Sequence, residues 1–260
     1  MISDSILSQL AAIVGQEHLL HHPRDLVAYS FDATPLHQAR PDAVVFPTST
    51  AQVQAILRLA VREGFPVIPR GSGTNLAAAT VPNQGGVVLV LTRMNRVVEV
   101  DTENLTATVQ PGVITAAFQA QVEALGLFYP PDPGSMAIST LGGNVATGAG
   151  GLRGLKYGVT RDYVLGLEAV LPSGDVLRTG GKVMKDVAGY DLTKLLVGSE
   201  GTLAVITEIL LKLVPQPEAK RTLLALFPQL GDAARAVSGI IAARIVPATL
   251  EFLDQATARV

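Results

Sequence analysis

The chain has 260 residues, of which 48% are hydrophobic and 16% charged, so it can bury a large core in one or two domains. Its net charge of −2 gives no electrostatic reason to expect nucleic-acid binding. The lack of cysteine excludes disulfides, thiolate nucleophiles and iron–sulfur ligands among its own residues. Neither a signal peptide nor a transmembrane segment is predicted, because basic residues do not precede the first apolar run and polar residues interrupt the later ones. The expected location is the cytoplasm.

The first 40 residues are expected to form a helical segment, because apolar residues recur at helical spacing between positions 2 and 20. A β-α-β pattern follows, with a strand at 43–46, a helix at 51–63 and a strand at 66–69. Further strands are predicted at 86–91, 96–100 and 106–110, before a helix at 113–125. A β-α-β start that becomes a run of strands favours the α+β class over a doubly wound sheet.

After residue 158 the pattern predicts strands at 163–171 and 175–178, a short helix at 191–196 and a long strand at 202–214. The segment Pro215-Gln-Pro217 is the clearest domain boundary. Beyond it, a strand at 221–227, a helix at 230–244 and a strand at 248–253 are expected to begin a second α/β unit. We therefore expect three parts, at 1–40, 41–217 and 218–260. The last would be an incomplete domain with an unpaired sheet edge, as in a truncated chain.

Two glycine-rich stretches carry the functional signal, at 70–76 and 129–158. Such glycine density indicates a backbone that adopts positive φ or lies against a ligand, and in the longer stretch no regular element is predicted. Hydroxyls and backbone N–H groups suit a phosphate, a ribose or the polar edge of a heteroaromatic ring. Two stretches of this kind favour one extended ligand held from two sides, the alternative being long flexible loops.

Several other sites are disfavoured by spacing. Gly71 and Gly73 match the first two glycines of a dinucleotide fingerprint, but Leu76 occupies the third position. The four histidines all lie in the first 40 residues, which indicates a solvated segment rather than a metal site or a serine triad. No metal ligand and no catalytic residue is therefore assigned.

A set of motifs recurs in order along most of the chain: Pro69-Arg-Gly-Ser-Gly-Thr74, Met94-Asn-Arg96 with Asp101, Val109-Gln-Pro-Gly112, Pro130-Pro-Asp-Pro133, Leu141-Gly-Gly-Asn144, Lys156-Tyr-Gly158, Lys185-Asp-Val-Ala-Gly-Tyr-Asp-Leu192 and Gly198-Ser-Glu-Gly-Thr-Leu203. With these motifs, residues 41–217 resemble the FAD-binding domain of the vanillyl-alcohol oxidase/PCMH-type flavoproteins. Within that group they are most similar to the FAD-binding subunit of glycolate oxidase and to FAD-dependent D-lactate dehydrogenases. The resemblance implies a two-subdomain FAD-binding domain followed by the start of a substrate-binding (cap) domain.

The resemblance also implies which residues hold FAD. The loop from Arg70 to Leu76 would surround the pyrophosphate, and two later segments would follow the ribityl chain and the isoalloxazine ring. Residues from Glu200 to Ile206, at the start of the long strand predicted at 202–214, would support the flavin or the adenosine. The complete expected set is Arg70, Gly71, Ser72, Gly73, Thr74, Asn75, Leu76, Gly134, Ser135, Thr140, Gly142, Gly143, Thr147, Gly148, Ala149, Gly150, Glu200, Gly201, Val205 and Ile206.

Two departures from the family pattern matter. The segment 77–80 reads Ala-Ala-Ala-Thr where relatives often carry glycines and a serine, which would alter the packing of the loop. No histidine lies in either glycine-rich stretch, so a covalent histidyl linkage to the flavin is not expected.

The activity that the resemblance implies is oxidation of a small 2-hydroxy acid, glycolate or D-lactate, by hydride transfer to flavin N5. Electrons would pass to a quinone or to a redox partner subunit carrying an iron–sulfur cluster or a second flavin. In relatives the substrate-binding domain supplies the histidines that polarise the substrate, bind a metal where one is used and accept the hydroxyl proton, and those positions are not among these 260 residues. The alternative is a non-catalytic FAD-binding or electron-transfer subunit that needs a partner or a further C-terminal domain.

Overall fold

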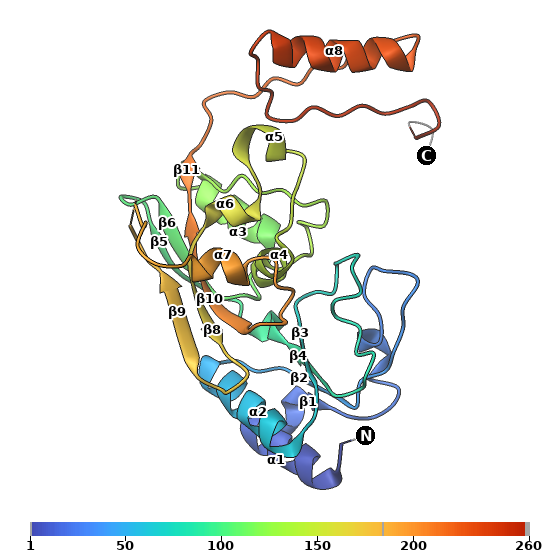
Figure 1. The fold of residues 1–260 in the computed structure, drawn as a ribbon, viewed down its shortest axis with the longest axis vertical. Coiled ribbons are helices and arrows are strands. Elements are labelled where there is room, and N and C mark those ends of the chain that lie inside the picture. The colour runs from blue at the N-terminus through green and yellow to red at the C-terminus, as the bar shows by residue number, and fades with distance from the viewer. Residues whose placement is uncertain (1, 184, 258–260) are drawn as a thin grey trace.

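The computed structural model describes residues 2–183 and 185–257, which form two sheet-based units and a C-terminal extension (Figure 1). The helices are α1 (Asp4–Val14), α2 (Thr50–Glu63), α3 (Thr115–Glu123), α4 (Leu141–Thr147), α5 (Gly154–Tyr157), α6 (Thr160–Tyr163), α7 (Leu192–Leu196) and α8 (Leu230–Ala242). The strands are β1 (Leu19–Leu20), β2 (Ala43–Val45), β3 (Val67–Arg70), β4 (Val87–Val90), β5 (Val97–Asp101), β6 (Thr106–Val109), β7 (Leu127–Phe128), β8 (Val164–Val170), β9 (Val176–Gly180), β10 (Val205–Lys212) and β11 (Val214–Pro215). The α+β class is confirmed.

The first unit is a four-stranded sheet in the order β1-β2-β4-β3, whose central strands are parallel. β2 and β4 are buried along their whole length, as expected for continuous apolar runs in a parallel sheet. α2 covers this sheet with an apolar stripe at Val53, Ile56 and Ala60. It begins where the Ser49 hydroxyl accepts a hydrogen bond from the Gln52 amide, and it ends at Gly64.

The N-terminal segment joins this unit instead of remaining one helix to residue 20. α1 ends at Gly15, and a 3₁₀ turn, η1 (Gln16–His18), leads into β1, which pairs with β2. Ile6, Leu10 and Val14 of α1 are buried in the same core as α2. The expectation of a solvated histidine segment is therefore wrong for His18, whose side chain is only 15% exposed.

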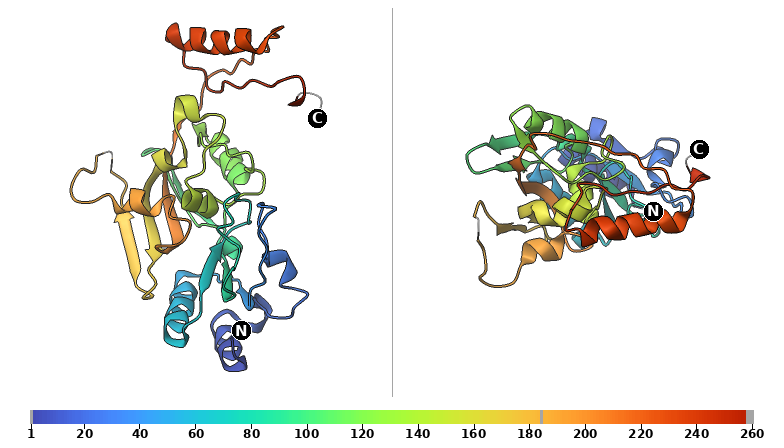
Figure 2. Two further views of the ribbon diagram at one scale, coloured as in Figure 1. Left: turned by 45° about the vertical axis from the view of Figure 1, so that its right-hand side comes forward. Right: turned by 90° about the horizontal axis from the view of Figure 1, so that it is seen from above.

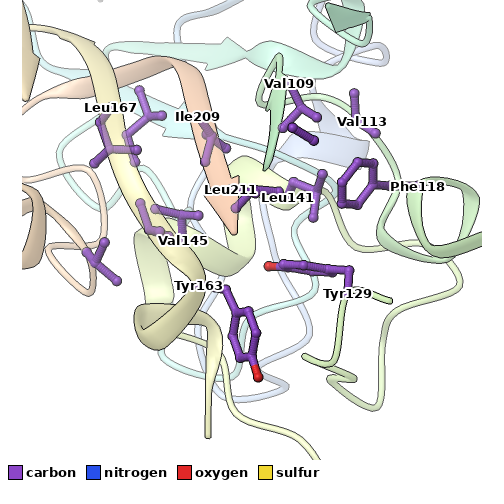
Figure 3. Close-up of a cluster of buried hydrophobic side chains, with 14 of the residues drawn as sticks. Val109, Val113, Phe118, Tyr129, Leu141, Val145, Tyr163, Leu167, Ile209 and Leu211 are labelled. Carbon is purple, nitrogen blue, oxygen red and sulfur yellow. The ribbon is translucent and has the colours of Figure 1, made fainter. Parts of the chain in front are cut away.

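The second unit is an antiparallel sheet in the order β5-β6-β10-β8-β9. Its core face packs against helices α3 and α4, and Phe118 and Tyr129 lie edge-to-face there with ring centroids 5.3 Å apart (Figure 3). Ile209 and Leu211, on alternate positions of β10, are fully buried in this cluster. The second glycine-rich stretch packs against this core.

The glycine-rich stretch is partly helical, contrary to the expectation of no regular element. α4 runs through Leu141-Gly-Gly-Asn-Val-Ala-Thr147, and the hydroxyl of Thr140 caps it by accepting a hydrogen bond from the Gly143 amide at 3.2 Å. Leu141 and Val145, four residues apart, are both fully buried in the second core. Tertiary packing of these two side chains offsets the low helix propensity of the glycine pair.

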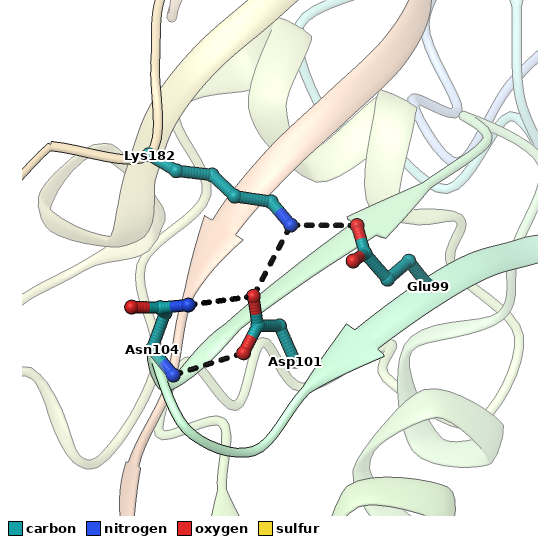
Figure 4. Close-up of polar contacts among 4 residues, drawn as sticks. All are labelled: Glu99, Asp101, Asn104 and Lys182. Carbon is teal, nitrogen blue, oxygen red and sulfur yellow. Dashed lines mark hydrogen bonds and ion pairs between the residues drawn. The ribbon is translucent and has the colours of Figure 1, made fainter.

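The five-stranded sheet is strongly curled. Lys182, just after the edge strand β9, donates to Glu99 at 2.7 Å and to Asp101 at 3.3 Å on the opposite edge strand β5 (Figure 4). In a flat sheet four steps of about 4.8 Å would separate these edges by roughly 19 Å, beyond the reach of one lysine side chain. Hydrogen bonds from the side chain and backbone of Asn104, together with Lys182, lower the pKa of Asp101 to about 2.

The two units meet where β6 ends. Gly112 donates from its amide to the Met94 carbonyl at 2.7 Å, next to η3 (Leu91–Arg93), which follows β4. A Cβ atom at Gly112 would lie 2.8 Å from that carbonyl oxygen and 2.9 Å from the Cα of Thr92. Only glycine permits this backbone-on-backbone contact, which brings the two sheets together.

Residues after β11 extend away from both units (Figures 1 and 2). β11 pairs with β7, and the Gln216 amide donates to the Gly126 carbonyl at 3.0 Å. The predicted helix forms as α8, but the predicted strands at 221–227 and 248–253 are wrong, because within the described residues neither segment has a neighbouring strand to bond with. Across the described ranges, no helix has both the length and the hydropathy needed to span a bilayer.

Candidate cofactor site

A cavity of about 510 Å³ lies between the two units, walled by both glycine-rich stretches. This volume is in the range of small-molecule and cofactor sites. The lining comes from the end of β3 and its following loop, from α4 and the turns around it, and from the residues that precede and open β10. The lining residues are Pro69, Arg70, Gly71, Ser72, Gly73, Thr74, Asn75, Leu76, Ala77, Ala79, Thr80, Leu91, Pro111, Ser135, Thr140, Gly142, Gly143, Asn144, Ala146, Thr147, Gly148, Ala149, Gly150, Glu200, Gly201, Ala204 and Ile206.

The structure brings together all but two of the residues expected to hold the cofactor. Val205 is buried against the first core while Ile206 faces the cavity, since neighbouring residues of a strand point to opposite sides. Gly134 does not line the cavity.

Other lining residues were missed by sequence reasoning. Pro111 belongs to the motif Val109-Gln-Pro-Gly112 and Asn144 to Leu141-Gly-Gly-Asn144, so the family motifs could have identified both. The sequence gives no sign that Leu91, Ala146 and Ala204 belong to a site, because small and apolar residues at these positions also suit an ordinary core.

The two glycine-rich stretches touch across the cavity. The Ser72 hydroxyl donates to the Ile138 carbonyl at 2.5 Å. Gly71 lies so close to the Thr140 side chain that a Cβ at position 71 would collide with its hydroxyl. The loop and the turn before α4 therefore form one continuous cradle.

The loop offers backbone donors to an anion. Within the described part of the chain, Gly73, Thr74 and Leu76 make no hydrogen bond, although all three line the cavity. Consecutive backbone N–H groups in a glycine-rich loop form an anion-binding concavity. The loop therefore has the donors that a diphosphate requires.

The Arg70 side chain lies beneath this loop and is 7% exposed. Its guanidinium donates to the Phe31 carbonyl at 2.7 Å and packs over the Tyr29 ring at 5.6 Å. Burial lowers the pKa of Arg70, while Asp32 and Tyr29 oppose that shift. Its positive charge is thus held against the back of the loop.

The remaining cavity wall is largely apolar, with Leu91, Pro111, Ala204 and Ile206 among its residues. These side chains suit the faces of a flat aromatic ring. Among the described lining residues no histidine, cysteine or tyrosine is present, and Glu200 is the single carboxylate. The site therefore combines anion donors and ring-binding walls with few groups able to transfer a proton.

Two neighbouring glycines of α4 give a test of the cradle. A Cβ at Gly142 would lie 2.9 Å from the Cα and from the carbonyl oxygen of Pro111, whereas one at Gly143 meets only the Thr140 hydroxyl, at 3.1 Å. We expect Gly142→Ala to destabilise the cofactor-free protein by about 1–3 kcal/mol. Gly143→Ala, which adds the same methyl to the same helix, should leave the unfolding midpoint nearly unchanged. Equal midpoints in thermal unfolding of the two variants would contradict the close contact with Pro111.

Comparison with known proteins gives a uniform result. Residues 41–180 match the family model described as FAD binding domain, and residues 216–260 match FAD linked oxidases, C-terminal domain. The chain is 58% identical over 257 residues to the glycolate oxidase subunit GlcD of Bacillus subtilis (strain 168), covering 99% of this chain and 55% of that protein. It is 41% identical over 218 residues to a D-lactate dehydrogenase of Anaerostipes hadrus, covering 84% of this chain and 46% of that protein.

The fold has solved counterparts. The structure of p-cresol methylhydroxylase with substrate bound superposes with a TM-score of 0.79 at 23% identity, over 93% of this chain and 49% of that one. The chain spans about half the length of the curated relatives that it matches.

Proposed function

Because the chain belongs to the family of FAD-binding domains of FAD-linked oxidoreductases, we propose that it oxidises glycolate or D-lactate as the flavin-binding part of a 2-hydroxy acid dehydrogenase. The observation that carries the proposal is the cavity between the two glycine-rich stretches, in a chain 58% identical to a glycolate oxidase subunit. The expected cofactor residues fit FAD, since the donors of the loop and the apolar wall line one cavity.

When bound, FAD supplies at N5 the acceptor for the hydride that leaves the α-carbon of the substrate. The chain's own residues would bind the cofactor and orient it. The amides of Gly73, Thr74 and Leu76 would hold the diphosphate, and Leu91 and Ile206 would flank a ring and exclude water.

A redox partner is part of the proposal. The Bacillus subtilis relative is named as a subunit, which supports transfer of electrons to another polypeptide. The scarcity of ionisable groups in the described lining favours a second candidate for the chain as given, a flavin-binding unit that depends on other residues for its substrate.

Flavin binding should be non-covalent. Among the described lining residues there is no side chain of the kinds that link to flavin through a histidine, cysteine or tyrosine. Precipitation with trichloroacetic acid is expected to release yellow FAD into the supernatant. Colour that stays in the pellet would refute this linkage, and purified protein that neither carries nor rebinds FAD would refute the cofactor site.

The substrate class is tested on FAD-loaded protein in which the chain is joined to the part of its Bacillus subtilis relative that it does not cover. Anaerobic glycolate or D-lactate should bleach the oxidised flavin band, with L-lactate as the stereochemical control. A flavin that stays oxidised with both proposed substrates, in a protein that dithionite reduces, would refute the substrate class.

A further inference from the structure

The loop that lines the diphosphate side of the cavity is tied to the N-terminal segment by several hydrogen bonds, and one hydroxyl stands at their centre. Thr80 Oγ1 accepts hydrogen bonds from the Arg70 guanidinium and from Nδ2 of the Asn75 side chain, both at 3.3 Å, and donates to Asp32 Oδ2 at 3.2 Å. One donated and two accepted bonds use the full capacity of a hydroxyl group. Its orientation is therefore completely determined by these three partners.

The carboxylate of Asp32 is fixed in the same way. Asp32 is 8% exposed and accepts from the Thr34 amide at 2.9 Å and from the Thr80 amide at 3.4 Å. Burial raises the pKa of Asp32, but these hydrogen bonds outweigh it and hold the pKa below its ordinary value. Asp32 is thus a buried anion that faces the buried cation of Arg70 across Thr80.

The same contacts set the shape of the loop. Asn75 Oδ1 accepts from the Ala77 amide at 3.2 Å and from the Ala79 amide at 3.1 Å. Between them, the Ala78 amide donates to Thr34 Oγ1 at 3.1 Å, and Ala78 has a φ of 56°. A residue with a Cβ in this left-handed region is strained by about 1–2 kcal/mol, so the surrounding contacts must impose it.

Gly73 shows how the support reaches the cavity. It lies directly on the Arg70 guanidinium, where a Cβ would collide with Nη2, and its φ is 72°. The cation thus lies against Gly73, a residue of the segment that lines the cavity. Its field favours an anion on the cavity side without a direct contact being needed.

We propose that Asp32, Thr80 and Arg70 form a clamp by which the N-terminal segment holds the 70–76 loop in the shape that binds the diphosphate of FAD. In this arrangement Arg70 is a positioning residue, and residues 29–34 belong to the cofactor site although Asp32 does not line the cavity. The inference rests on the FAD site proposed above and adds to it which distant residues set its affinity.

The test compares FAD with riboflavin, which lacks the diphosphate, by quenching of flavin fluorescence. Asp32→Asn keeps the shape of the side chain and removes its charge. We expect the affinity for FAD to fall about tenfold and that for riboflavin to stay unchanged, with faster amide hydrogen exchange at residues 71–80 in the cofactor-free protein. Asp25→Asn is the matched control, a carboxylate of the same segment whose recorded ion pair is with exposed Arg24, and it should bind both ligands like the original protein.

A second variant and a double variant complete the test. Thr80→Val removes the bridging hydroxyl at constant volume and should reproduce the selective loss of FAD if Asp32→Asn does not fold. Within one clamp the effects are non-additive, so Asp32→Asn with Arg70→Gln should bind FAD little worse than Arg70→Gln alone. Equal losses for FAD and riboflavin, or additive losses in the double variant, would overturn the clamp. Failure of the original protein to bind FAD would instead refute the cofactor site itself.

Discussion

Mixed anaerobically with D-lactate or glycolate, the FAD-loaded 260-residue protein is expected to keep its oxidised flavin absorption. The cavity lining offers one carboxylate, Glu200, on the exposed turn before β10, and one cation, Arg70, already committed to Phe31 and Thr80. General base catalysis typically contributes about 10²- to 10⁴-fold, and positioning of the substrate adds further. We therefore expect reduction to be slower, by at least that factor, than in an enzyme that has a positioned general base.

Reduction of the same sample by dithionite is the control, because it shows that the flavin is bound and reducible. Rapid bleaching by either hydroxy acid would show that the catalytic groups lie within these 260 residues. Glu200→Gln would then be the first variant to examine, as Glu200 is the carboxylate of the described lining.

Substitution of Gly112 is expected to have the largest effect on stability. The atoms that an added methyl would meet are backbone atoms of η3 and its neighbours, which cannot rotate away as a side chain can. Overpacking of this kind costs about 3 kcal/mol, which lowers the unfolding midpoint of a chain of this size by roughly 6–12 °C. Because Pro111 and Leu91 border the cavity on either side of the contact, Gly112→Ala should also weaken FAD binding.

Gly134→Ala is the matched control. Gly134 belongs to the second glycine-rich stretch, yet no atom lies within 4 Å of a Cβ built there. The unfolding midpoint and the FAD affinity of the Gly134→Ala variant should match those of the original protein. A small effect at Gly112, or an equal effect at Gly134, would show that the two units do not depend on this contact.

Most strands up to residue 215 could be predicted because their signals are local, but the two-residue strands β1 and β7 were not. β2, β4 and β10 are apolar runs ended by proline, glycine or charged residues, and α2 has both a cap and an apolar stripe. The loop 70–76 was recognisable for the same reason, since its glycines follow a strand directly. The presence of a second glycine-rich stretch then suggested one ligand held from two sides.

The remaining features depend on contacts between distant residues. α4 forms because Leu141 and Val145 reach a core built by β6, β8 and β10, which the sequence around the glycine pair does not reveal. The direction of the Arg70 side chain is set by Phe31 and Thr80, contacts that the sequence of the loop does not reveal. Similarly, the segments 221–227 and 248–253 have strand-like composition but no partner strand among the described residues.

The ion pairs of Lys182 with Glu99 and Asp101 also affect how the edge of the sheet can pair with another chain. β5 is an edge strand, and such strands can recruit a strand from another chain. Here Glu99 and Asp101 stand on that strand, and Lys182 is bound to both. An incoming strand would have to settle beside three ionic groups and strip water from them, which costs free energy that backbone pairing must overcome. We therefore expect this cluster to disfavour edge-to-edge pairing of the sheet with another chain.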